Sequence, residues 1–170
     1  SAVRERSAGV AWGVASAVKL PLRDRIADVF GSLETTEPLQ DDSPFLSEVG
    51  RVLAVDGVFV CSTPNRSVTN PGAHLRDRPT NPFHVREYAR EEFEALLRER
   101  FGSVDLYGQN PSSHRLPALA GRLLRHPLAA RANQVRKLTR LLRAPGDHAV
   151  EPASPSRAWE YLTAVCRNPR

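Results

Sequence analysis

A run of apolar and β-branched residues, VFVCST at 58–63, constrains the fold of this chain more than any other stretch. Strands that read as near-continuous apolar runs lie in sheets covered on both faces, usually parallel sheets with helices between the strands. The preceding segments fit that pattern, because 26–34 (IADVFGSLE) reads as a strand and 43–53 (SPFLSEVGRVL) as a helix with one apolar side. An Asp56-Gly57 turn is expected to join this helix to the run.

The rest of the chain extends this alternation of strands and helices. Residues 9–17 (GVAWGVASA) read as an earlier strand, and 86–101 (REYAREEFEALLRERF) reads as an amphipathic helix. SVDLYGQ at 103–109 and AWEYLTAVCR at 158–167 read as two closing strands. This order predicts an α/β fold with a mostly parallel sheet and an antiparallel last strand.

A basic segment precedes the last strand. Residues 106–146 contain no acidic residue, and 115–143 reads as one or two amphipathic helices, so we expect 111–150 to form a basic helical insertion or cap. Such a segment can cover an acceptor pocket, pack as plain surface, lie on an anionic membrane or bind nucleic-acid phosphates. Because residues 108–157 contain no Phe, Tyr or Trp, we expect no nucleic-acid partner and no stable membrane association.

The composition favours a reducing compartment. The 170-residue chain is 41% hydrophobic with a net charge of +5, values typical of one globular domain. Its two cysteines form neither a disulfide framework nor a metal-ligand pattern, and no apolar run is long enough to span a membrane or to serve as a signal peptide. These features together predict a cytoplasmic protein.

Four phrases occur in a fixed order: LETTEPL at 33–39, AVDG at 54–57, STPN at 62–65 and NPFHVREY at 81–88. Together with YLTAVCR near the end, they resemble the carboxyl-terminal half of a class I S-adenosylmethionine-dependent methyltransferase, in the branch that contains small-molecule and sugar O-methyltransferases. The resemblance covers residues 9–110 and 158–167. It implies S-adenosylmethionine as cofactor and a small-molecule acceptor.

The resemblance is incomplete at the cofactor end. The family holds its cofactor with a D-x-G-x-G-x-G loop after the first strand and a carboxylate after the second, and neither occurs in these 170 residues. Residues 9–17 resemble the family's third strand. The resemblance therefore implies an incomplete Rossmann-like sheet, in a single partial methyltransferase domain over 1–170. Self-association through the exposed sheet edge is a further expectation.

The family's sheet order also implies a core contact. It makes the strands 58–63 and 158–167 antiparallel neighbours, which would bring Cys61 and Cys166 close together as buried thiols.

The resemblance, with the rule that α/β sheets bind ligands at the carboxyl ends of their strands, also implies site residues. His84 and Glu37 are the expected catalytic residues, with His84 as the base that takes the proton of an acceptor hydroxyl. Cofactor contacts are expected at Ser16, Ala17, Leu33 and Glu34, and acceptor contacts at Asn65, Arg66, Arg86 and Tyr88. The histidines show no ligand spacing, so we expect no metal site.

Structural roles remain open for the same side chains. His84 could order its loop by hydrogen bonding or simply be exposed, and Glu34 and Glu37 could be capping or solvated residues. Arg86 and Tyr88 could do no more than begin the next helix.

Two functions follow from these patterns. The first is S-adenosylmethionine-dependent methylation of a hydroxyl on a small-molecule or sugar-like acceptor, by a protein present here as a truncated chain. The alternative is a non-catalytic methyltransferase-like remnant or interaction module that does not bind the cofactor.

Overall fold

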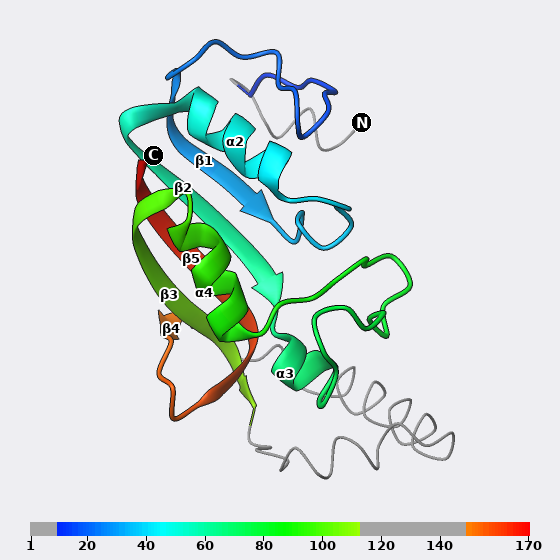
Figure 1. The fold of residues 1–170 in the computed structure, drawn as a ribbon. Coiled ribbons are helices and arrows are strands. Elements are labelled where there is room, and N and C mark those ends of the chain that lie inside the picture. Colours follow the sequence, from blue (N-terminus) through cyan, green and yellow to red (C-terminus); the bar gives the residue numbers. More distant parts are fainter. Residues whose placement is uncertain (1–9, 113–148) are drawn as a thin grey trace.

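Residues 10–112 and 149–170 are described in a computed structural model, where they form one mixed sheet with helices packed on it. The strands are β1 (Ala27–Leu33), β2 (Leu53–Pro64), β3 (Phe101–Ser112), β4 (Glu151–Pro152) and β5 (Ala158–Pro169), and the helices are α2 (Ser43–Val52), α3 (Arg66–Thr69) and α4 (Arg90–Arg98). The strand order is β1-β2-β5-β3-β4 (Figure 1). The strand β1 is parallel to β2, and the remaining neighbours are antiparallel. The expected α/β class with an antiparallel last strand is confirmed. The expectation of a mostly parallel sheet is wrong for the described residues, because among them only β1 and β2 pair in parallel.

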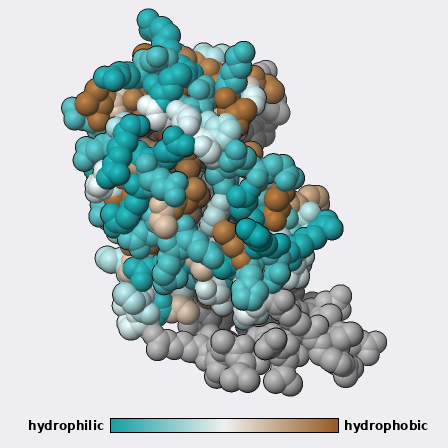
Figure 2. All heavy atoms as spheres, in the orientation of Figure 1, coloured by the Kyte–Doolittle hydropathy of each residue, from teal (hydrophilic) through white to brown (hydrophobic). Residues whose placement is uncertain are grey.

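Helices α2 and α4 pack on the same face of the sheet (Figure 1). Phe59 of β2 lies at the centre of this core, with its ring 5.4 Å from Phe101, 5.9 Å from Phe30 and 6.3 Å from Phe45 between centroids. The outer surface of this side is mainly hydrophilic, with hydrophobic residues in small groups (Figure 2). The opposite face of β1 is open, since Val29 is 67% and Leu33 66% exposed.

The prediction of a strand at 9–17 is wrong. Residues 10–15 have no regular structure, and Ser16 makes only an isolated antiparallel bridge to Lys19. Trp12 and Val14 are exposed. A strand requires a neighbour to pair its backbone N–H and C=O groups, and within the described residues no strand lies beside β1 on its outer edge.

The prediction of an Asp56-Gly57 turn between the helix and the strand is also wrong, because β2 already begins at Leu53. The chain does deviate there: Ala27 pairs with Leu53 but Val29 pairs with Val58, so 54–57 form an irregularity within the strand. A Cβ at Gly57 would lie 2.8 Å from the Leu53 side chain and 2.9 Å from the carbonyl oxygen of Ala27. Gly57 thus permits a close backbone approach.

The pairing of β2 with β5 confirms the expected core contact between the cysteines. Phe59 lies opposite Cys166 and Cys61 opposite Ala164, and both cysteines are buried free thiols. Burial raises the pKa of the Cys61 thiol, and the hydrogen bond with Cys166 raises it further. The Cys61 thiol should therefore remain protonated at neutral pH.

The expected insertion at 111–150 lies almost entirely outside the described residues. Only its ends are described, at 111–112 and at 149–150. Next to it, Glu151–Pro152 form β4, a two-residue strand that the sequence did not indicate.

Candidate functional site

The carboxyl ends of β1 and β2 meet at one edge of the sheet, and Glu34 lies there. Its φ of 52° turns the chain sharply after β1. Ser62 of β2 donates its hydroxyl to Glu34 Oε1 at 2.9 Å, and Ser62 O accepts the Glu34 backbone N–H at 3.2 Å. Partial removal from water raises the pKa of Glu34, although the Ser62 hydrogen bond opposes this. Glu34 is thus a fixed carboxylate at the expected ligand edge.

Glu37 joins this edge to the loop that follows α3. Its backbone carbonyl accepts the N–H of Val85 at 2.7 Å and that of Arg86 at 3.3 Å. The side chain is fully buried; Oε1 accepts the Thr36 hydroxyl at 3.3 Å, whereas Oε2 has no hydrogen-bond partner among the described residues. A buried carboxylate oxygen without a partner is unusual and costly, so Glu37 is a strong candidate for a ligand contact.

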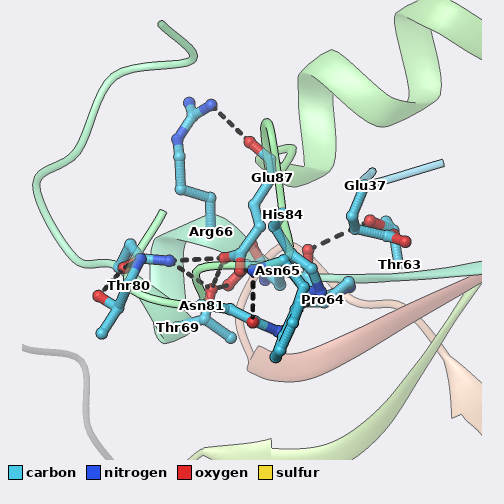
Figure 3. A network of polar contacts seen from close by, with 12 residues as sticks. Glu37, Thr63, Pro64, Asn65, Arg66, Thr69, Thr80, Asn81, His84 and Glu87 are labelled. Atoms are coloured by element: carbon cyan, nitrogen blue, oxygen red, sulfur yellow. Dashed lines mark hydrogen bonds and ion pairs between the residues drawn. The ribbon is translucent and has the colours of Figure 1, made fainter. Parts of the chain in front are cut away.

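His84 lies in a polar network within the loop between α3 and α4 (Figure 3). Its Nδ1 is 2.9 Å from Glu87 Oε1, and its Nε2 is 2.8 Å from Asn81 Nδ2. Glu87 is buried at 3% exposure, and its Oε2 also accepts hydrogen bonds from Thr69 Oγ1 and, at 2.6 Å, from Asn70 Nδ2. Both ring nitrogens of His84 therefore have partners, as expected for a histidine that orders its loop.

Asn65 and Arg66 support the scaffold at the start of α3. The Asn65 amide donates to Trp159 O at 2.9 Å and accepts the Ser67 N–H at 3.2 Å. Arg66 is buried and donates to Glu87 O at 3.0 Å and to Glu92 Oε1 at 2.7 Å. These side chains are occupied by protein partners, although acceptor contacts were expected from them.

Arg86 and Tyr88 form a second cluster with Asp42, the residue before α2. The Tyr88 hydroxyl donates to Asp42 Oδ2, and Arg86 Nη1 lies 3.4 Å from the same oxygen. Arg86 also donates to the carbonyl oxygens of Leu39 and Gln40. Because 86–88 are tied to the β1–α2 segment in this way, α4 begins only at Arg90 and not at Arg86.

The other expected cofactor residues lie at separate places in the chain. Ser16 is exposed and accepts the Val18 N–H at 3.4 Å through its hydroxyl, while Ala17 packs against the core. Leu33 ends β1 with its side chain exposed, directly before Glu34. Leu33 and Glu34 therefore lie at the edge where ligand binding is expected, whereas Ser16 and Ala17 belong to the segment that lacks the expected strand.

Sequence reasoning missed the residues that hold the loop together, chiefly Asn81, Glu87 and Asp42. Two signals could have found them. Asn81 precedes a proline, and Glu87 lies three residues after His84. A carboxylate near a histidine is a common way of fixing the imidazole tautomer.

At 10–112 and 149–170, no group of three or more His, Cys, Asp or Glu side chains could hold a metal ion. Among these residues there is also no helix long and apolar enough to cross a membrane.

Known proteins similar in sequence to this chain are methyltransferases by name. A family model described as a methyltransferase domain matches residues 1–61. A probable S-adenosylmethionine-dependent methyltransferase of Mycolicibacterium smegmatis is 47% identical over 79 residues, which cover 46% of this chain and 30% of the relative. A probable S-adenosylmethionine-dependent methyltransferase of Mycobacterium tuberculosis is 40% identical over 104 residues, 61% of this chain and 36% of the relative.

The fold is similar to that of a solved methyltransferase. The crystal structure of an S-adenosylmethionine-dependent methyltransferase from Thermotoga maritima, described as a possible histamine N-methyltransferase, aligns with a TM-score of 0.61 at 15% identity, over 91% of this chain and 61% of that one. The sequence matches and the fold are both similar to those of class I S-adenosylmethionine-dependent methyltransferases. The resemblance seen in the sequence is confirmed, and the cofactor it implies is the one in the relatives' names. The matched part of this chain spans about a third of the length of the curated relatives.

The described residues offer suitable chemistry for only one portion of S-adenosylmethionine. Leu33 and Glu34 supply an exposed apolar side chain and a fixed carboxylate at one edge, a chemistry that suits the adenosyl portion. The glycine-rich loop and the ribose-binding carboxylate of the family occur nowhere in the 170 residues. These residues therefore do not make a complete cofactor site.

Proposed function

We propose that the protein transfers a methyl group from S-adenosylmethionine to a hydroxyl of a small-molecule or sugar-like acceptor. This chain would supply the acceptor side of the site, at the carboxyl ends of β1 and β2. The observation that carries the proposal is the pair of carboxylates at this edge: Glu34 is held by Ser62, and the buried Glu37 has an oxygen without a partner. In this proposal Glu34 would bind hydroxyls of the cofactor and Glu37 would bind those of a polar acceptor.

The acceptor would lie between the β1–α2 segment and the loop that carries His84. These two segments are joined by the hydrogen bonds from Val85 and Arg86 to the Glu37 carbonyl, so a ligand there would meet a preformed wall. Preformed geometry matters because methyl transfer depends mainly on aligning acceptor and donor. S-adenosylmethionine, when bound, supplies the methyl group. In this proposal His84 is the base that accepts the hydroxyl proton, because a neutral imidazole nitrogen can bind it.

Several further features remain part of the proposal. The chain is a single partial methyltransferase domain, with 111–150 as a basic cap, and it works in the cytoplasm. His84 and Glu37 act in catalysis, Ser16, Ala17, Leu33 and Glu34 contact the cofactor, and the acceptor contacts come from Asn65, Arg66, Arg86 and Tyr88. The geometry supports Leu33, Glu34 and Glu37 most, because they are at the ligand edge and have exposed or unsatisfied groups.

The first test is a calorimetric titration of the 170-residue chain with S-adenosylhomocysteine, followed by a labelled-methyl transfer assay over hydroxyl-bearing small molecules and sugars. Glu34→Gln should weaken binding or transfer, because it removes the carboxylate at the ligand edge. Glu91→Gln, an exposed carboxylate in the first turn of α4, is the matched control. A folded chain that neither binds nor transfers would contradict the proposal for this chain.

A non-catalytic binding module is the second candidate. Its support is the polar network itself: His84, Asn65, Arg66, Arg86 and Tyr88 are all engaged with protein partners. A folded circular dichroism spectrum without any binding of S-adenosylhomocysteine would favour this candidate.

A further inference from the structure

The orientation of the Asn81 side chain is fixed by its own loop. Its Oδ1 accepts the backbone N–H of Phe83 at 3.1 Å, so the amide nitrogen must be the atom that faces His84. That nitrogen, Nδ2, lies 2.8 Å from His84 Nε2. An amide nitrogen only donates hydrogen bonds, so Nε2 must accept and carries no proton in this arrangement.

The other ring nitrogen completes the assignment. With Nε2 unprotonated, the neutral imidazole carries its proton on Nδ1, which donates to Glu87 Oε1 at 2.9 Å. Glu87 is itself immobilised, because Thr69 Oγ1 and Asn70 Nδ2 both donate to its other oxygen. Asn70 in turn accepts from the backbone N–H of Thr80 at 3.0 Å. The carboxylate is thus held from several sides before it meets the histidine.

We propose that Glu87 is a positioning residue that holds His84 in the Nδ1–H tautomer, with Nε2 as the proton-accepting nitrogen and Asn81 as its cap. This inference rests on the proposed function, in which His84 is the base. When an acceptor hydroxyl binds, it replaces the Asn81 amide as the donor to Nε2. The proton then leaves the acceptor oxygen and binds Nε2, and the imidazolium formed is stabilised by the Glu87 carboxylate.

The tautomer can be measured without cofactor or acceptor. Nitrogen-15 NMR of the histidine rings in the 170-residue chain distinguishes protonated from unprotonated ring nitrogens. The His84 signals are assigned by their loss in His84→Gln, and the exposed His74 serves as an internal reference. We expect the neutral imidazole of His84 to carry its proton on Nδ1 and none on Nε2. A proton on Nε2 alone would overturn the inference.

A single substitution of Asn81 should replace the hydrogen-bond donor that faces His84 Nε2 with an acceptor. Asn81→Asp keeps an oxygen for the Phe83 N–H but presents a second oxygen, not a donor, to Nε2. A carboxylate on each side of the ring should then hold His84 as the doubly protonated imidazolium, with both nitrogens protonated. Ring signals that do not change in this variant would contradict the capping role of Asn81. Circular dichroism spectra of the variants check that the fold is retained.

The activity assay separates this inference from the proposed function. If the chain transfers methyl groups, Glu87→Gln should lower kcat by roughly 10²-fold, the scale of a general base, with little change in KM for the acceptor. Glu87→Asp should restore part of kcat. The expected tautomer without any methyl transfer would contradict the proposed function alone. Methyl transfer with a kcat unaffected by Glu87→Gln would contradict the role of Glu87 alone.

Discussion

At the scale of single residues, Asp42 is a group whose ionisation the fold disfavours. Burial raises its pKa, while the hydrogen bond from Tyr88 and the charge of Arg86 oppose the shift. Because the folded-state pKa is above the unfolded one, the contribution of Asp42 to stability is largest below its unfolded pKa. It is lost as pH rises through the folded pKa.

Asp42→Asn removes that titration and keeps an oxygen that can accept from Tyr88. We expect the free energy of unfolding of the variant, relative to the original chain, to improve as pH rises from about 3 to about 7. Urea unfolding at several pH values measures this difference. Asp56→Asn, at an exposed position in β2, is the control for the loss of a carboxylate. A relative stability of Asp42→Asn that falls with pH would contradict the stated direction.

Residue roles were less predictable from the sequence than residue positions. α/β sheets bind ligands at the carboxyl ends of their strands, and this rule placed Glu34, Glu37 and His84 near one edge of the sheet. It could be applied because runs of apolar residues in the sequence reveal where strands end. It could not show that His84 is bonded on both sides, since Asn81 and Glu87 act through the loop's tertiary path. The partners of Arg86 were hidden for the same reason: Asp42 lies 44 positions earlier in the chain.

At the scale of elements, the packing of β3 against β5 depends on Gly108. A Cβ built there would lie 2.0 Å from the Trp159 ring, which is itself buried under the strand. Gly108→Ala should therefore destabilise the chain by about 1–3 kcal/mol, because the indole must move. Gly31→Ala in β1 is the matched control, since a Cβ at Gly31 meets nothing within 4 Å. Thermal unfolding compares the two, and equal melting temperatures would contradict this packing.

The aromatic core gives a second prediction at this scale. Phe59 of β2 is fully buried among three other phenylalanine rings, whereas Phe83 in the loop after α3 is 82% exposed. Phe59→Ala should lower the free energy of unfolding by about 3–5 kcal/mol, while Phe83→Ala should change it by less than about 0.5 kcal/mol. Chemical denaturation of both variants measures this contrast. A tolerated Phe59→Ala would show that the core is assembled differently.

Helices and strands with a clear apolar pattern and a neighbouring element to pack on could be predicted from the sequence. The helix α2 and the strands β1, β2, β3 and β5 all carry clear apolar patterns, and each has a neighbour to pack on. The segment 9–17 has an apolar composition but lacks a neighbouring strand, and composition alone does not supply one. The strand β4 is too short for any pattern and exists only through its pairing with Tyr107 and Gly108.

At the scale of the whole molecule, we expect the outer edge of β1 to favour self-association of this chain. Within the described residues β1 pairs only with β2, and Val29 and Leu33 on its open face are about two-thirds exposed. An unpaired strand edge beside apolar side chains favours association with a second copy. We therefore expect concentration-dependent self-association of the 170-residue chain, visible as a rising mean mass in sedimentation velocity.

Val29→Lys places a charge on this face and should shift the distribution toward monomer, because pairing two copies would bury that charge. Val14→Lys is the control, since Val14 is equally apolar and fully exposed but lies outside the sheet. Equal shifts for both variants would mean that added charge in general, and not the β1 edge, limits association. An unsubstituted chain that stays monomeric at every concentration would show that the edge is protected, and would remove self-association from the properties expected of this chain.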